Sequence, residues 1–242
     1  MRPGGWGALL VTAAERALGR RNLVLVGFMG TGKSTLGAVV ASALRRRFVD
    51  TDALVAARAG RSIPELFASL GEAGFRDLEA EAVAESAAGA RCVLATGGGV
   101  LGRPANLEAL RAGGVLVALV AEPQVLLRRV GGAGGARRRP LLAGGGDPLA
   151  RIEELQRARA TLYAQADLTL DTTHLSRHAA VLALLQLCAA QAAAVRPVPA
   201  GPGRTAAGPG AAARRRPPRA PGAGGGSRGV QPDGGPERSP GP

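Results

Sequence analysis

One nine-residue segment, GFMGTGKST at residues 27–35, constrains the fold of this chain more than any other feature. It follows a short β-rich run, Asn22–Gly27, and opens a helical pattern at Lys33. The spacing G-x4-G-K-[ST] therefore lies in the strand–loop–helix context of a phosphate-binding P-loop, whose glycines let backbone N–H groups surround phosphate oxygens at a helix N-terminus. We expect Lys33 to reach the β- and γ-phosphates of a nucleoside triphosphate and Ser34 to bind Mg²⁺.

Composition supports this role for Lys33. The chain has 31 Lys and Arg residues, and Lys33 is the single lysine among them. A compact ammonium on a thin stem fits beneath a phosphate loop, where a planar guanidinium does not. Lysine is therefore used at the one place where its chemistry is required.

The net charge of +13 raises nucleic acid and membrane surfaces as partners, but the distribution of the charge weakens that interpretation. Residues 196–242 hold eight of the arginines, and 23 of these 47 residues are Gly or Pro. Such a segment cannot offset its own ordering entropy, so we expect a disordered tail without a specific nucleic-acid partner. The longest apolar run, Ala179–Val195, is mostly alanine and shorter than the roughly 20 residues of a bilayer span, which favours a packed helix and no membrane.

The N-terminal segment and the cysteines add two expectations. Residues 1–20 are predicted to be a loose extension, and their apolar run, broken at Glu15 and Arg16, is too short and too charged for a signal peptide. Cys92 and Cys188 form no disulfide framework and have no C-x-x-C spacing. Reduced thiols in a cytoplasmic protein are therefore expected.

Between these ends, over residues 21–195, short apolar runs alternate with helical patterns, which predicts an α/β fold with a parallel sheet covered on both faces. Five strands are predicted, at Asn22–Gly27, Phe48–Asp50, Arg91–Thr96, Val115–Val120 and Asp167–Leu170. The helical patterns are Lys33–Arg46, Asp52–Ala88 with breaks around Gly60 and Gly71, Asn106–Ala112, Glu122–Val130, Leu149–Gln165 and His174–Ala194. Seven glycines within Gly131–Gly146 predict a mobile loop.

Two carboxylates, Asp50 and Asp52, stand at the end of the second predicted strand. Asp50 is suited to hold magnesium-bound water, and Asp52 to accept the proton of an acceptor hydroxyl as its base. Helix N-capping by Asp52 is the alternative, because a D-x-D pair alone is weak evidence.

Arginines in two segments indicate an anionic acceptor and a closing lid. Arg76 and Glu79 share a helix face, so Glu79 can hold the guanidinium in one pose for bidentate binding of a carboxylate; an ordinary helical ion pair is the alternative. Arg137–Arg139 lie inside the glycine-rich loop, and Arg157 and Arg159 follow it. Such a loop can close over ATP and bring an arginine to the developing charge, although a charged lid rim would look the same.

The third predicted strand ends in Gly97, Gly98 and Gly99. Doubly wound sheets bind ligands at the carboxyl ends of their strands, and glycines there let a ligand press against backbone amides. A flexible turn is the alternative.

Together these segments resemble the shikimate kinase family. The resemblance covers residues 21–192 or so and rests on GFMGTGKST, FVDTD, GEAGFRDLE, LATGGG, RRRPLL and RATLY, in that order. It implies a P-loop kinase fold like that of nucleoside-monophosphate kinases, with a central five-stranded parallel sheet, a substrate-binding helical region and a lid. It also implies phosphorylation of the 3-hydroxyl of shikimate by ATP and Mg²⁺. Thr161 replaces the family's usual proline, and the lid is longer and looser than usual.

The resemblance implies a role for individual residues as well. Lys33, Asp52 and Arg139 would be catalytic, with Arg138 as the alternative lid arginine. Ser34 would bind Mg²⁺ directly and Asp50 through water. The implied ATP site comprises Gly30, Thr31, Gly32, Lys33, Ser34, Thr35, Arg129 beside the adenine, and Arg139. The implied shikimate site comprises Asp52, Arg76, Gly97, Gly98, Gly99 and Arg159, with Glu79 positioning Arg76.

Two other functions stay open. A kinase of the same fold that acts on gluconate or a nucleoside monophosphate would need another acceptor site, and Arg76, the glycine triplet and Arg159 argue against it. A non-enzymatic basic module that binds nucleic acid through the tail would lack stacking aromatics, since Phe, Tyr and Trp total six in the chain. A monomer acting on shikimate and ATP is the expectation.

Overall fold

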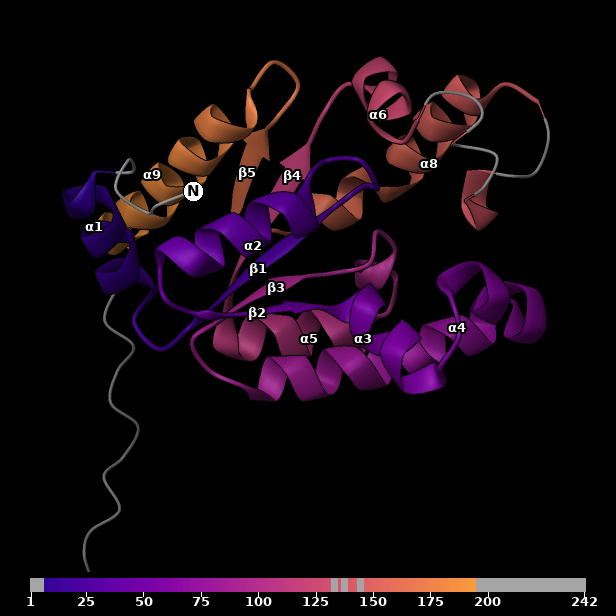
Figure 1. Ribbon diagram of the computed structural model, residues 1–242, viewed down its shortest axis with the longest axis horizontal. Helices are drawn as coiled ribbons and strands as arrows, with labels where there is room; N and C mark the ends of the chain where they lie inside the picture. Colours follow the sequence, from indigo (N-terminus) through magenta and orange to yellow (C-terminus); the bar gives the residue numbers. More distant parts are fainter. Residues whose placement is uncertain (1–6, 132–134, 136–138, 143–145, 195–242) are drawn as a thin grey trace, which may run out of the picture. The chain divides into compact units, whose positions relative to one another are not determined.

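The computed structural model describes residues 7–131, 135, 139–142 and 146–194 (Figure 1). The predicted disordered tail, residues 196–242, lies outside the described residues, as does most of the predicted mobile lid at 131–146. Arg138, the alternative lid arginine, is outside them too, whereas Arg139 is described.

A five-stranded parallel sheet with the strand order β2-β3-β1-β4-β5 forms the centre of the molecule. The strands are β1 (Asn22–Gly27), β2 (Arg47–Asp50), β3 (Cys92–Ala95), β4 (Gly114–Val120) and β5 (Leu168–Asp171). Each lies within one residue of its predicted bounds, and the predicted α/β fold is confirmed. Strand β1 is central and all six of its residues are buried, as its uninterrupted apolar sequence indicates.

Helices cover both faces of the sheet. They are α1 (Ala8–Leu18), α2 (Lys33–Ala43), α3 (Thr51–Ala59), α4 (Ile63–Ala88), α5 (Pro104–Gly113), α6 (Pro123–Arg129), α8 (Pro148–Tyr163) and α9 (Arg177–Ala194), with short 3-10 turns η1 (Val100–Gly102) and η2 (Pro140–Leu142). The predicted breaks near Gly60 and Gly71 are confirmed: α3 ends at Gly60, and α4 is kinked at Gly71, where φ is 68°. Among the described residues, none of the helices has the length and hydropathy needed to span a bilayer.

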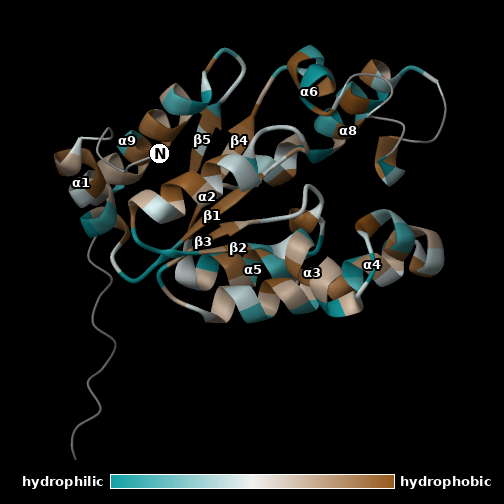
Figure 2. Ribbon diagram, viewed as in Figure 1, coloured by the Kyte–Doolittle hydropathy of each residue, from teal (hydrophilic) through white to brown (hydrophobic). Residues whose placement is uncertain are grey.

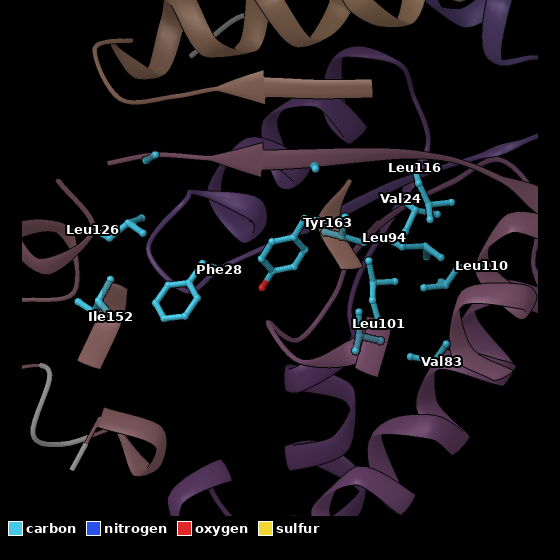
Figure 3. Packing of buried hydrophobic residues seen from close by; sticks show 14 of the residues in the cluster. Val24, Phe28, Val83, Leu94, Leu101, Leu110, Leu116, Leu126, Ile152 and Tyr163 are labelled. Atoms are coloured by element: carbon cyan, nitrogen blue, oxygen red, sulfur yellow. The ribbon is translucent and has the colours of Figure 1, made fainter. Parts of the chain in front are cut away.

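The core divides into two layers because the side chains of β1 alternate across the sheet. Leu23 and Leu25 pack with α1, α2 and α9 on one face. Val24 and Val26 pack on the other face with α4, α5, α6 and α8, in a cluster that Figure 3 shows from close by. The strands form the continuous apolar centre in Figure 2, and polar residues lie mainly on the outer helix surfaces.

Residues 8–18 contradict the prediction of a loose N-terminal extension. They form helix α1, which packs beside α9 (Figure 1) and buries Ala14 and Leu18 completely. Glu15, which breaks the apolar run in the sequence, anchors the helix instead: its carboxylate accepts from Arg46 Nε at 2.6 Å and pairs with Arg91 at 2.6 Å. Sequence analysis missed this because both arginines come from distant parts of the chain.

The role of α1 can be tested with Leu18→Ala. Because Leu18 is buried against α9 and α2, the substitution is expected to lower the free energy of unfolding by about 2–5 kcal/mol. Urea denaturation of the full chain measures this. The matched control is Leu9→Ala on the same helix, whose side chain is 87% exposed and whose loss should cost less than about 0.5 kcal/mol. Equal small losses for the two variants would mean that α1 contributes nothing to the folded domain.

Candidate active site

The P-loop begins where β1 meets β4. Gly27 has a φ of 136°, and a Cβ there would lie under 3.0 Å from the carbonyl oxygen of Leu119. Gly30 and Gly32 also have positive φ values, 82° and 99°, so the loop turns in the left-handed region that favours glycine before α2 starts at Lys33. The sequence motif therefore folds as a strand, a glycine-dependent loop and a helix N-terminus, as predicted.

Lys33 is buried beneath this loop. Its Nζ donates to the carbonyl oxygens of Gly27 at 2.7 Å and Phe28 at 3.0 Å. Burial lowers the pKa of Lys33 to about 8, while Asp52 and Asp50 act in the opposite direction. The ammonium is therefore mostly charged at neutral pH, and the two carbonyl oxygens of the loop hold it in place.

Ser34 and Asp50 bring two hard oxygen donors together. Ser34 Oγ donates to Asp50 Oδ2 at 2.5 Å, and Asp50 Oδ1 accepts from the backbone N–H groups of Asp52 and Ala53. Asp50, not Asp52, is therefore the N-cap of α3. A hydroxyl beside a carboxylate suits Mg²⁺, which takes one or two protein oxygens and completes its shell with water and phosphate.

Asp52 is a half-buried residue whose Oδ1 atom is shielded from solvent. Its Oδ1 has no hydrogen-bond partner among the described residues. Burial, followed by the negative charge of Glu79, raises the pKa of Asp52 to about 6, against the opposing effect of Lys33. A carboxylate with a free oxygen and a raised pKa is suited to accept a proton from a hydroxyl group.

Neighbouring side chains leave no room for a Cβ at two of the three glycines that follow β3. A Cβ at Gly97 would lie under 3.0 Å from Glu79 Oε1 and Asp52 Oδ1, and a Cβ at Gly99 would collide with the Arg76 guanidinium. At Gly98 the nearest atoms are 3.5 Å away or more, an ordinary contact distance. None of the three has a positive φ. Close packing of charged side chains, rather than turn flexibility, thus explains Gly97 and Gly99.

Arg76 on α4 contacts two glutamates. Its Nη1 donates to Glu79 Oε2 at 2.8 Å, and its Nη2 donates to Glu72 Oε1 at 3.0 Å. Burial alone would lower the pKa of Arg76, but Glu79 and Glu72 together raise it above its ordinary value. The predicted pairing with Glu79 is present, and Glu79 is only 1% exposed, which makes it more than a surface ion pair.

Arg159 and Tyr163 on α8 converge on the carbonyl oxygen of Gly98. Arg159 Nη1 donates to it at 3.1 Å and the Tyr163 hydroxyl at 2.6 Å, while the Arg159 guanidinium lies 5.7 Å from the centre of the Phe28 ring. Sequence analysis assigned no role to Tyr163. Its position four residues after Arg159, on the same helix face, was the available signal.

Arg129, the last residue of α6, is hydrogen-bonded to Thr172. Its guanidinium donates to the backbone oxygen of Thr172 at 2.6 Å and to Thr172 Oγ1 at 3.0 Å. Thr172, which follows β5, is a second residue that sequence analysis missed. Arg129 and Arg139 line the same cavity as Lys33.

The predicted site residues line two cavities, with the exceptions of Gly97, which lines neither, and Arg138, which lies outside the described residues. The first, of about 610 Å³, is lined by the P-loop residues 29–36 together with Asp50, Asp52, Gly98, Arg129 and Arg139. The second, of about 350 Å³, is lined by Arg76, Glu79, Gly99 and Arg159, among others. Gly98 and Gly99, one lining each cavity, are consecutive residues. The arrangement suits a large phosphorylated ligand in the first cavity and a small carboxylate in the second.

Comparison with known proteins agrees with this geometry. The family model for shikimate kinase matches residues 29–189. This chain belongs to the shikimate kinase family. Shikimate kinase from Symbiobacterium thermophilum is 53% identical over 145 residues, which cover 60% of this chain and 82% of that protein. Shikimate kinase from Caldanaerobacter subterraneus subsp. tengcongensis is 46% identical over 153 residues, which cover 63% of this chain and 87% of that protein.

Solved structures of shikimate kinases share the fold of this family member. The enzyme from Acinetobacter baumannii, in complex with shikimate, has a TM-score of 0.66 and 32% identity, covering 72% of this chain and 96% of that one. The enzyme from Bacteroides thetaiotaomicron has a TM-score of 0.62 and 34% identity, and the match covers 69% of this chain and 97% of that one. Helix α1 precedes the residues that the family model matches.

The raised pKa of Asp52 predicts a titration near pH 6. In the ligand-free full chain, NMR of the carboxyl carbons should give this midpoint for Asp52, and Glu79→Gln should lower it because one like charge is removed. Asp171, whose pKa is lowered by hydrogen bonds from Thr173, should titrate below its ordinary value in the same spectra. If Asp52 is the base, kcat must fall as the pH drops through its midpoint. A midpoint near 4 for Asp52 would contradict this electrostatic account.

Proposed function

We propose that this kinase transfers the γ-phosphoryl group of ATP to the 3-hydroxyl of shikimate, giving shikimate 3-phosphate and ADP. Its membership of the shikimate kinase family supports the reaction. The observation that carries the assignment of residues is the pairing of two cavities, one lined by the P-loop and Asp52 and one by Arg76 and Arg159. Shikimate is a small anionic ring with several hydroxyls, which matches two arginines, an aspartate and a glycine wall.

ATP binds in the larger cavity. Residues Gly30 to Thr35 supply backbone and side-chain contacts to the phosphates, and Lys33 stabilises the charge that develops on the transferring group. Arg139 approaches the phosphates from the lid, and Arg129 flanks the adenine. Ser34, with Asp50 through water, would hold a magnesium ion, which when bound neutralises phosphate charge.

Asp52 orients the acceptor hydroxyl and takes its proton. Its unpartnered Oδ1 and raised pKa support this role. Transfer is direct and in line, because the described residues of the site offer no spare nucleophile for a phosphoenzyme, and positioning with charge neutralisation is sufficient.

Arg76 and Arg159 grip the carboxylate of shikimate in the smaller cavity. Glu79 fixes Arg76 from its buried side, and the backbone of Gly97, Gly98 and Gly99 forms the wall against the ring. Two arginines with fixed guanidinium planes suit bidentate contacts to a carboxylate. A neutral polyol would leave both cations without a partner, which disfavours such acceptors.

Lys33→Met should abolish phosphoryl transfer while the chain stays folded. The ammonium stabilises transferring charge, and methionine can occupy a similar apolar volume at this buried position. We expect kcat to fall by at least about 10²-fold, measured by ADP release, with a cooperative thermal transition retained. Lys33→Arg keeps the charge but not the shape and should lose activity as well. Turnover close to that of the wild type in Lys33→Met would contradict the P-loop assignment.

The carboxylate clamp can be tested with Arg76→Ala and shikimate methyl ester. Loss of one charge-assisted contact should cost roughly 2–4 kcal/mol, so KM for shikimate should rise about 30- to 1,000-fold and KM for ATP should change little. The ester should be a poor substrate of the wild type and should lose much less when Arg76 is removed, because it never had the full contact. Steady-state kinetics of both enzymes with both substrates form a double cycle. Equal losses for acid and ester would show that Arg76 is only a structural partner of Glu79.

A further inference from the structure

The two glutamates on Arg76 differ in kind. Glu79 is 1% exposed and binds Nη1, whereas the side chain of Glu72 is 56% exposed and binds Nη2. Glu79 is fixed by its burial between α4 and the glycine triplet. Glu72 follows the kink at Gly71 directly and reaches Arg76 one turn along the helix. Glu79 has the properties of a permanent support, and Glu72 those of a replaceable partner.

The Arg76 guanidinium lines the smaller cavity together with both of its glutamates and with Arg159. Glu79 engages Nη1 and Glu72 engages Nη2, the atom to which a Cβ at Gly99 would lie nearest. Of the two glutamates, Glu72 is the exposed one. A substrate carboxylate that binds Arg76 from this cavity comes close to the carboxylate of Glu72, and two like charges beside one cation repel each other.

We propose that Glu72 tunes the affinity for the acceptor: its carboxylate binds Nη2 of Arg76 before the acceptor binds, and the acceptor's carboxylate competes with it for the guanidinium. This inference rests on the proposed binding of the acceptor by Arg76. An ion pair whose carboxylate is exposed to water, as that of Glu72 is, is weak, so a carboxylate held by two arginines can replace Glu72, while a neutral acceptor cannot. The competition sets the affinity for anionic acceptors and leaves the chemical step unchanged.

The test is the direction of the change in KM for Glu72→Gln. Removing the competing charge should lower KM for shikimate about two- to fivefold, because an exposed pair is worth less than about 1 kcal/mol. The kcat value and KM for ATP should be unchanged, and shikimate methyl ester should be unaffected because it does not compete for Arg76. Glu154→Gln is the matched control: Glu154 also forms an exposed helical ion pair, with Arg151 at 2.6 Å, and should alter no kinetic constant.

Other outcomes overturn the inference. A higher KM for shikimate in Glu72→Gln would mean that Glu72 orients Arg76 for binding, and an unchanged KM would mean that it is an ordinary surface ion pair. Calorimetric titration of shikimate into Glu72→Ala measures affinity without turnover and should show the same two- to fivefold tightening. Failure of the proposed acceptor site is distinguishable, because then Arg76→Ala would leave KM for shikimate unchanged whatever Glu72 does.

Discussion

The close approach of Gly27 to Leu119 requires a glycine at the end of the central strand, where the phosphate loop begins. Strand β1 pairs with β4 through Gly27, and any side chain at this position would collide with the β4 backbone. On its other side β1 pairs with β3, which leads into the glycine triplet, and β3 pairs with β2, which ends at Asp50. Because the strands are parallel, these segments leave the sheet at one edge, and the functional groups meet there.

Two cations and two carboxylates lie close together in the candidate site, and the two carboxylates are neighbours. Lys33 lies near Asp52, Asp52 near Glu79, and Glu79 against Arg76, as the influences on their pKa values show. Burial shifts the pKa of Lys33 down and that of Asp52 up, so the charged form of each group is less favoured than it is in water. Each lacks a full complement of opposite charge or hydrogen-bond donors. Phosphates beside Lys33 and a hydroxyl on Asp52 would supply what is missing, which gives ligand binding part of its driving force.

Local patterns predicted the sheet, and they predicted that most residues of the candidate site would lie close together. Strands with continuous apolar sequence, the P-loop spacing and the pairing of Arg76 with Glu79 are encoded within a few residues, and the structure brings these residues together where expected. Features that depend on contacts between distant parts of the chain could not be predicted from these local patterns. Glu15 interrupts the apolar run of α1 in the sequence, yet it meets Arg46 and Arg91 in the fold. The capping of α3 by Asp50 rather than Asp52 depends on backbone angles that the D-x-D spacing does not reveal.

The glycine triplet shows how the two proposed arginines are held by different means. Arg76 occupies the space that a side chain at Gly99 would fill, and two carboxylates hold it. Arg159 instead donates to the backbone of Gly98, where Tyr163 donates as well, and its guanidinium lies near the Phe28 ring. Arg76 thus depends on one buried charge, Glu79, and one exposed charge, Glu72, whereas Arg159 depends on neutral groups. If both arginines bind the acceptor as proposed, the contacts of Arg76 can adjust to a carboxylate while Arg159 stays fixed.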